Sequence, residues 1–408
     1  MRALYSGVTG IRSHQVRMDV IGNNIANVNT VGFKGSRVTF QDVFSQTMSA
    51  GSASTSPQQV GLGAGVASTD LNGAAGSFQL TGRDLDLAIE GAGLFVLKSP
   101  GDGQRVYTRV GNFDWDAQGY MVNPATGQRV QGWMADSDGT VSNTGIASLG
   151  DIQLIRGDVS LAQLTTSAAF GGNLDSGADD GDTYQTTFTA YDSLGNPVPI
   201  VLTFEKTGTN DWSWEAEGPA AAGVTGSGDL TFNPDGTILT GGTNIQVNIA
   251  SPPGGDDAQA VALDFTRITQ AYAGTQGSSV LARTVDGYPM GVLESISVEQ
   301  SGQITGVFSN GFRRTLAQVA VASFSNPNGL LKEGNTAFVE SANSGAPQIG
   351  TPTTGGRGRL VPGNLEMSNV DLSTEFTNMI TTQRGFQANT RIITAADEML
   401  QDVVNLRR

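Results

Sequence analysis

Two ladders of apolar residues at seven-residue spacing, one at each end of the chain, constrain its fold more than any other feature. Such spacing places an apolar stripe along a helix and is typical of helices that pair as a coiled coil. We therefore expect helices over residues 3–28 and 371–406 that pair as a coiled-coil-like stem. The stripe residues, including Phe376 beside the second ladder, are Leu4, Ile11, Met18, Ile25, Leu372, Phe376, Met379, Phe386, Ile393 and Leu400.

The first predicted helix contains poor helix formers. Gly7, Gly10 and several asparagines lie within it, and each costs up to about 1 kcal/mol relative to alanine. Because packing provides most of the stability of such a helix, we expect it to form only when its apolar stripe is buried. The second helix has one comparable weak point, Gly385, and the pair Ser368 and Asp371 before it resembles a capping box.

The sequence between the two helices has the composition of a β protein. The 408 residues include 55 glycines, and only 15% of the residues are charged. Short apolar runs alternate with turn signals such as Asn-Pro-Asp-Gly at 233–236, a pattern that favours strands joined by tight turns. The predicted fold class is mainly β with terminal α-helices, and the β part consists of an inner β-domain interrupted by an outer β-domain.

Changes in this pattern divide the chain into four expected parts. The stretch 171–182 is rich in glycine and aspartate and reads as an acidic turn, and alternating strands follow it. Trp212 and Trp214 share one face of such a strand, where they serve either core packing or surface contacts. The four parts are a helical terminal domain (1–30 with 366–408), a connecting segment (31–76 with 341–365), an inner β-domain (77–150 with 284–340) and an inserted outer β-domain (151–283).

Composition also argues against several classes of function. The chain has no cysteine and a single histidine, His14, so we expect no zinc site and no thiol or histidine catalysis. Acidic pairs such as Asp114 and Asp116 read as turn residues, and no phosphate-binding loop is present, so we expect no catalytic, cofactor or metal residues and no enzyme. The net charge of −15 disfavours nucleic acid, and no apolar run approaches the length of a membrane span.

Several separated segments resemble bacterial flagellar rod and hook proteins, the axial proteins of the flagellum. Residues 18–34 are similar to the N-terminal signature of this family, and residues 370–391 are similar to its C-terminal partner segment. Residues 90–96, 107–113 and 324–330 resemble the inner β-domain of the family. The positions that match the N-terminal signature are Asn23, Asn24, Asn27, Gly32 and Phe33.

The resemblance implies a mechanical function. The inserted region 151–283 favours the hook members of the family, since the distal rod protein is expected to lack it. The implied role is that of a structural subunit that self-assembles into a curved hollow tube, a universal joint that transmits motor torque to the filament during swimming. The alternatives are a distal rod protein of the flagellar basal body and, in a different class, a secreted β-rich binding protein.

The resemblance also implies partners and a location. These are other copies of the chain, the flagellar type III export apparatus, the hook cap protein, the distal rod protein and the hook–filament junction protein. The chain would reach the flagellar hook, outside the cell, without a cleaved signal peptide. Phe40 and Phe44 resemble the export-gate recognition motif of such substrates, although both could simply pack on the body. Likewise, the glycines and asparagines of the first helix either keep it unfolded for export or are merely poor helix formers.

Overall fold

The structure is a computed structural model in which the chain divides into two compact units. Unit 1 contains residues 1–155, 296–305 and 314–408, and unit 2 contains residues 156–295 and 306–313. The residues described are 2–49, 56, 58–101, 103–136, 138–142, 145–155, 159–160, 162–243, 245–250 and 258–405.

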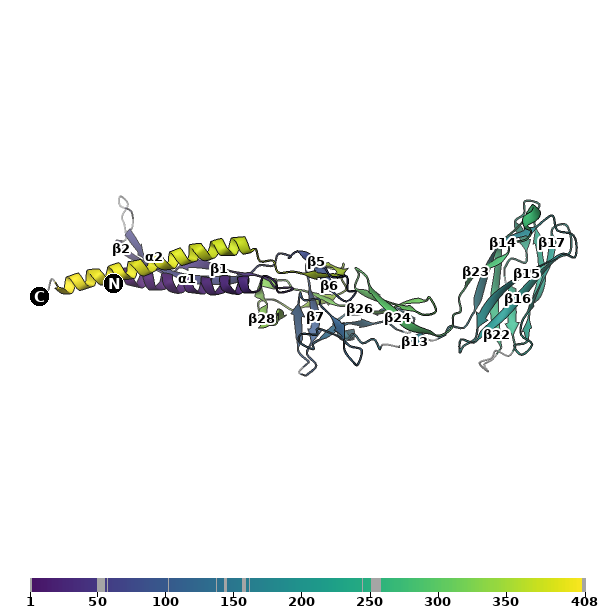
Figure 1. The fold of residues 1–408 in the computed structure, drawn as a ribbon, viewed down its shortest axis with the longest axis horizontal. Coiled ribbons are helices and arrows are strands. Elements are labelled where there is room, and N and C mark those ends of the chain that lie inside the picture. The colour runs from purple at the N-terminus through teal and green to yellow at the C-terminus, as the bar shows by residue number, and fades with distance from the viewer. Residues whose placement is uncertain are drawn as a thin grey trace. The chain divides into compact units, whose positions relative to one another are not determined.

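Two long helices begin and end the described chain, and they pack side by side in unit 1 (Figure 1). They are α1 (Arg2–Ala26) and α2 (Leu372–Asn405). The pair is antiparallel, because Gly7 at the start of α1 lies against Ile393 near the end of α2, whereas Asn24 reaches Glu375 in the first turn of α2. The predicted fold class, mainly β with terminal helices, is confirmed.

The start of α2 differs from the expected capping box. Asp371 itself is the cap: its carboxylate accepts hydrogen bonds from the Ser373 backbone N–H at 3.0 Å and from the Thr374 hydroxyl at 2.7 Å. These two bonds lower the pKa of Asp371. The Ser368 hydroxyl instead accepts from the backbone N–H of Val370, outside the helix. The cap thus lies three residues later than the sequence pattern indicated, because it is the Asp371 carboxylate that meets the first-turn donors of α2.

A two-stranded ribbon follows α1. Its lower part pairs β1 (Ser36–Asp42) with β4 (Ala64–Leu71) and packs along α1. Its upper part pairs β2 (Ser45–Ser49) with β3 (Gln58–Gly61). The sequence pattern predicted no strands here, because the ribbon is partly buried along α1 and exposed beyond it, and its strands lack a regular apolar alternation. The stretch 49–56, whose serine, alanine and glycine content predicts a loop, lies mostly outside the described residues.

The β-structure of unit 1 centres on a sheet in which neighbouring strands follow the order β26-β11-β7-β8-β29-β28. Tyr107 and Trp133 are buried in its core, and Tyr107 meets Phe324 edge to face at 4.8 Å. Besides the ribbon strands β1–β4, the strands of unit 1 are β5 (Phe78–Leu80), β6 (Leu87–Glu90), β7 (Leu94–Lys98), β8 (Arg105–Thr108), β9 (Asp114–Trp115), β10 (Met121–Val122), β11 (Arg129–Met134), β12 (Gly150–Asp151), β25 (Gln303–Phe308, shared with unit 2), β26 (Arg313–Val319), β27 (Val321–Ser323), β28 (Leu331–Gly334), β29 (Ala337–Val339), β30 (Gln348–Gly350), β31 (Arg359–Pro362) and β32 (Asn364–Glu366).

Unit 2 is a sandwich of two sheets around one apolar core. One sheet has the described order β18-β21-β22-β14-β23, and the other has β15-β16-β17-β19-β20. The sandwich strands are β14 (Ser167–Asp175), β15 (Thr183–Tyr191), β16 (Pro197–Lys206), β17 (Asp211–Glu217), β18 (Val224–Thr225), β19 (Ser227–Phe232), β20 (Ile238–Thr240), β21 (Ile245–Ile249), β22 (Gln259–Ala271) and β23 (Leu281–Val285). Outside the sandwich sheets, β13 (Val159–Ser160) pairs antiparallel with β24 (Gly291–Val298), which is shared with unit 1.

Two sequence-based interpretations meet different outcomes in unit 2. Trp212 and Trp214 both lie buried in the sandwich core, as the core-packing alternative predicts. The turn expected at 171–182 is wrong for its first half, because residues up to Asp175 belong to β14, which pairs parallel with β22. Gly172 was interpreted as a turn residue, but it lies within the strand. A Cβ there would lie 2.3 Å from the Ser279 carbonyl oxygen, so this glycine allows close packing of the backbone.

Candidate assembly site

Small residues allow α1 and α2 to approach each other closely. An added Cβ on Gly10 would lie 2.7 Å from the Asn389 side chain, and one on Gly385 would lie 2.7 Å from the His14 ring. A Cβ on Gly7 would meet Ile393 at 3.0 Å. These glycines, which cost helix propensity, therefore occupy positions where a larger side chain would force the helices apart.

The signature residue Asn24 joins three elements. Its side chain is buried, donates to the Ser36 carbonyl oxygen at 2.8 Å and to Glu375 Oε1 at 3.0 Å, and accepts from the Ser36 backbone N–H at 3.0 Å. One asparagine side chain thereby forms hydrogen bonds both with the backbone of the first residue of β1 and with a side chain in the first turn of α2. Farther along the pair, Arg17 donates to Asn378 at 3.4 Å.

The other signature residues shape the exit from α1. The Asn27 side chain donates to Asn23 and accepts from the Thr30 hydroxyl at 3.0 Å, which closes the turn after the helix. Gly32 has φ of +68°, and a Cβ there would lie 2.8 Å from the Val110 backbone nitrogen. Phe33 is buried beneath the Lys332 ammonium, which lies 5.3 Å from its ring centre.

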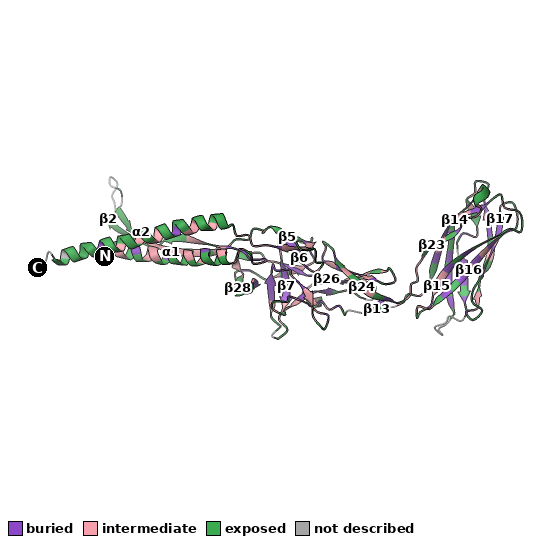
Figure 2. Ribbon diagram, in the orientation of Figure 1, coloured by how far each residue is buried: buried purple, intermediate pink, exposed green. Residues whose placement is uncertain are grey.

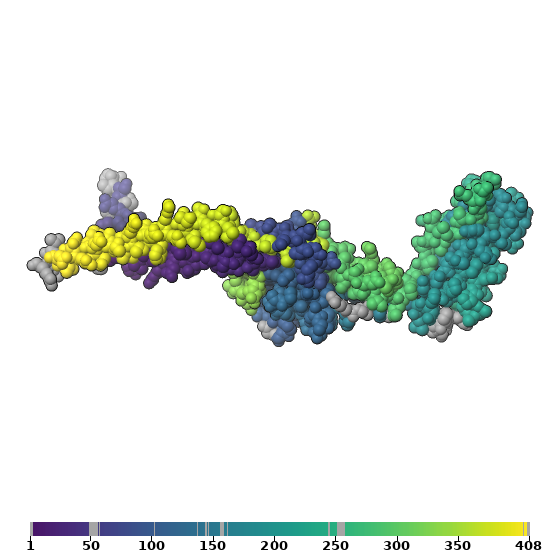
Figure 3. All heavy atoms as spheres, viewed as in Figure 1, coloured from purple at the N-terminus to yellow at the C-terminus, as the bar shows by residue number. Residues whose placement is uncertain are grey.

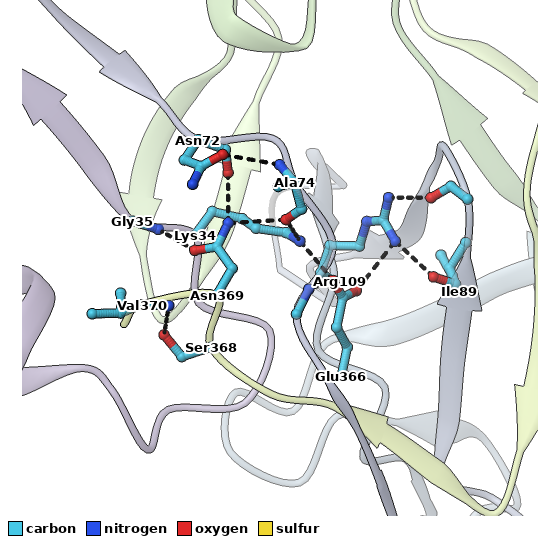
Figure 4. Close-up of polar contacts among 12 residues, drawn as sticks. Lys34, Gly35, Asn72, Ala74, Ile89, Arg109, Glu366, Ser368, Asn369 and Val370 are labelled. Carbon is cyan, nitrogen blue, oxygen red and sulfur yellow. Dashed lines mark hydrogen bonds and ion pairs between the residues drawn. The ribbon is translucent and has the colours of Figure 1, made fainter. Parts of the chain in front are cut away.

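A buried ionic cluster joins three segments that lie far apart in the sequence (Figure 4). Glu366, which is fully buried, accepts from Lys34 Nζ at 2.6 Å through Oε1 and from Arg109 Nη1 at 3.1 Å through Oε2. Arg109 also donates to the carbonyl oxygens of Ile89 and Gly91. Burial lowers the pKa of both Lys34 and Arg109, and Glu366 opposes that shift.

Asn369 extends this cluster toward α2. Its side-chain oxygen accepts from the Gly35 backbone N–H at 2.9 Å, and its amide nitrogen donates to the carbonyl oxygens of Asn72 and Ala74. Lys34 Nζ donates to the same Ala74 oxygen at 2.8 Å. The two segments that lead to α1 and α2 are therefore held to each other and to the inner β-domain by satisfied polar groups.

The predicted stripe residues are only partly covered by the helix pair. All four on α1, and Met379, Phe386 and Ile393 on α2, are half-buried. Phe376 remains 50% exposed, and Figure 2 shows α2 as largely exposed. Because the two helices cannot bury these stripes on each other, they leave apolar surface for other contacts. The exposed apolar residues of α2 are Leu372, Phe376, Ile380, Ile392, Met399, Leu400 and Val404.

The end of α2 extends past the start of α1 (Figure 3). Ile393 lies against Gly7, close to the start of α1 at Arg2, and α2 continues to Asn405, so the last residues of α2 run beyond α1. Leu400, the next stripe residue, is 41% exposed, and Val404 is 68% exposed. The stripe therefore continues where this copy has no helix to cover it.

The two candidate export residues have different environments. Phe40 packs on α1, with its ring 5.6 Å from that of His14 and 5.8 Å from the Arg17 guanidinium. Phe44 projects from the ribbon and is 72% exposed. Packing explains Phe40 alone, and the role of both residues in export stays a prediction.

Sequence reasoning missed the Glu366 cluster. Lys34 and Arg109 lie in segments that matched the family, but no local spacing joins either residue to Glu366, which is 332 and 257 positions away, respectively. Among the described residues, no group of His, Cys, Asp and Glu side chains is placed to hold a metal ion. No helix in the described part of the chain is long and apolar enough to cross a membrane.

Comparison with known families identifies the class of protein. Family models match along the chain in order: "Flagella basal body rod protein" at 4–34, "Flagellar hook protein FlgE/F/G D1 domain" at 88–162, "Flagellar basal body protein FlaE D2 domain" at 161–288, and "Flagellar basal body rod FlgEFG protein C-terminal" at 361–406. These four matches define an axial protein of the bacterial flagellum.

Relatives narrow the class further. A flagellar hook protein of Borreliella burgdorferi is 41% identical over the full length of both chains. The chain therefore belongs to the flagellar hook protein family. The crystal structure of a Helicobacter pylori flagellar hook protein shares the fold, with a TM-score of 0.52 at 15% identity over 71% of this chain and 100% of that one.

A rod protein also matches at full length. The flagellar basal-body rod protein FlgG of Bacillus subtilis is 32% identical over 100% of both chains. The inserted region 151–283 therefore does not by itself separate hook proteins from rod proteins.

Proposed function

We propose that this chain is the structural subunit of a flagellar hook and assembles through its terminal helices into a curved hollow tube. The tube acts as a universal joint that transmits motor torque to the filament. The exposed apolar stripe of α2 carries this proposal. In a chain with a net charge of −15, the side chains of Phe376 and Ile380 are exposed to water in a single copy. Contacts with neighbouring copies would bury them.

The four parts predicted from the sequence have separate tasks in this proposal. The helices of 1–30 and 366–408 form the tube core, and the connecting segments link them to the outer layers. The inner β-domain and the inserted outer β-domain surround the core. The sandwich of unit 2 supports a role as a separate outer body, because its apolar core is closed without help from another copy.

The proposal includes the partners and location expected of such a subunit. The chain leaves the cell through the flagellar type III apparatus without a cleaved signal peptide, with Phe40 and Phe44 as recognition residues. It then contacts the hook cap protein, the distal rod protein and the hook–filament junction protein. The proposed role is mechanical, with no catalytic activity and no cofactor.

Electron microscopy under polymerising salt tests the proposal. The full-length chain should form curved tubes, and a variant that lacks Leu372–Arg408 should form none while unit 2 remains folded. The double variant Phe376→Ser with Ile380→Ser should also fail to assemble, whereas Thr381→Ser, on the exposed surface of the same helix, should assemble normally. Stable monomers of the full-length chain in every condition would contradict the proposal.

A distal rod protein is the second candidate, and the full-length match to a Bacillus subtilis rod protein favours it. The same micrographs separate the two functions. A hook subunit should form curved tubes, and a rod subunit should form straight ones.

A further inference from the structure

The side chains of the ribbon that follows α1 change from partly buried to exposed near Val43. Below this point β1 and β4 pack along α1 and are partly buried. Above it, the described side chains are exposed, with Phe44 at 72% and Val60 at 39%. Residues 43–61 contain no charged side chain. A two-stranded ribbon exposed on both faces is marginally stable in water, so this charge-free arm gains most from a surface that covers it.

An apolar cavity of about 540 Å³ lies elsewhere in unit 1. Its apolar lining includes Leu71, Leu94, Phe324 and Phe338. Ala92 and its flanking glycines form another part of the lining, where small side chains leave the space unfilled. The volume is within the roughly 300–1,000 Å³ typical of ligand pockets, and it can admit an aromatic side chain.

We propose that the arm of one copy inserts Phe44 into this cavity on a second copy, so that each subunit carries a knob and the hole that receives its neighbour's knob. This inference rests on the proposed function, because it identifies a contact within the same polymer. The Phe44 ring would meet the rings of Phe324 and Phe338, and aromatic pairs favour such edge-to-face contacts.

The positions of the two features require a neighbour. The arm begins where Gly63 lies against Thr9, in the second turn of α1. The cavity is lined by Lys34, beyond the end of α1 at Ala26. The 17 residues of helix between Thr9 and Ala26 span about 25 Å at 1.5 Å per residue. A knob and a hole at different places on one surface make a head-to-tail contact, which leads to an open helical polymer rather than a closed dimer.

Charge also favours this occupant. Lys34 and Arg109 line the cavity and share one buried counter-ion, Glu366, so the wall carries one positive charge in excess. The arm, residues 43–61, has no charged side chain and is rich in serine, threonine and glutamine oxygens, so this positive wall does not repel it. The chain as a whole is acidic, with a net charge of −15, so an uncharged segment approaches a second copy with less electrostatic repulsion than an acidic segment would.

Two substitutions test the contact from its two sides. Phe44→Ala removes the knob, and Ala92→Trp fills the hole at an exposed residue whose backbone φ is not in the left-handed region. Each should raise the critical concentration for assembly at least about tenfold, as measured by sedimentation, while leaving thermal unfolding of the monomer unchanged. Leu239→Ala, which removes a 62% exposed side chain in unit 2, should have no effect. Assembly of both variants at the wild-type concentration would overturn the inference.

The absence of cysteine allows a direct test of direction. One population carries Phe44→Cys and a second carries Asn328→Cys, at an exposed residue that lines the cavity. Under an added mild oxidant, mixed polymers should yield disulfide-linked dimers, and neither population should cross-link alone. Tubes that form normally but give no mixed dimer would reject the arm contact and leave the proposed function standing. Failure of the wild-type chain to form tubes would reject both.

Discussion

The sandwich of unit 2 and the helical pair of unit 1 differ in how far their apolar residues are buried. In the sandwich, Phe170, Phe204 and Trp214 surround Phe265, and all four are buried. In the helical pair, the only apolar residues buried in the described parts of α1 and α2 are Ile21 and Ala396. The sandwich is complete as a single copy, whereas the helices carry stripes that one copy cannot cover. In the proposed polymer, the sandwich therefore contributes stability to each copy, and the helical stripes contribute contacts between copies.

The largest effect should come from the sandwich core. Phe265→Ala removes a ring with three edge-to-face partners and should lower the free energy of unfolding of unit 2 by about 3–5 kcal/mol. Denaturant unfolding followed by fluorescence of Trp212 and Trp214 measures the change. Tube assembly well below the unfolding midpoint should persist. If Phe265→Ala abolished assembly of a folded chain, the separation of stability from assembly would be wrong.

The Glu366 cluster should be nearly as sensitive. Glu366→Gln leaves Lys34 and Arg109 buried without a counter-ion and should cost about 3–5 kcal/mol in unit 1. Glu90→Gln is the matched control, because Glu90 pairs with Arg359 and both side chains are about half exposed. That control should cost less than about 1 kcal/mol. Equal costs in thermal unfolding would show that burial of the cluster does not matter.

A pair of glycine substitutions sharpens the comparison within the helices. Gly385→Ala places a Cβ 2.7 Å from the His14 ring and should destabilise the helical pair by about 1–3 kcal/mol. Gly22→Ala meets nothing within 4 Å and should instead stabilise α1 by about 0.5–1 kcal/mol. Helix unfolding followed by circular dichroism gives both signs. Stabilisation by both variants would mean that the close approach of the helices is not needed.

The smallest effect should be a dependence on pH. Burial, followed by the neighbouring Arg17, lowers the pKa of His14 below 6.5, so the folded state favours the neutral ring. This contribution to stability is present above pH 6.5 and is lost as the pH falls through the folded pKa. The loss should stay below about 1 kcal/mol, since the ring is only partly buried. Titration of the single histidine by NMR measures the pKa, and His14→Gln should remove the dependence.

The extent to which the sequence predicted the molecule varied with the kind of signal available. Periodic segments were predicted well, because Trp212 and Trp214 alternate with polar residues and the terminal stripes repeat every seven residues. The ribbon and the first half of 171–182 were missed, because exposed or glycine-containing strands lack that alternation. The Glu366 cluster could not be predicted locally, since it depends on three residues that only the tertiary fold brings together.

The cluster also makes the fold of the early segments depend on a residue near the end of the chain. Lys34 and Arg109 occur early in the sequence, and their counter-ion arrives only at residue 366, shortly before α2. A chain that stopped before that point would hold two cations in sites built for a carboxylate, and it would lack the helix that covers α1. Premature products would thus lack a closed stem, and they would offer no α2 stripe for the proposed contacts between copies.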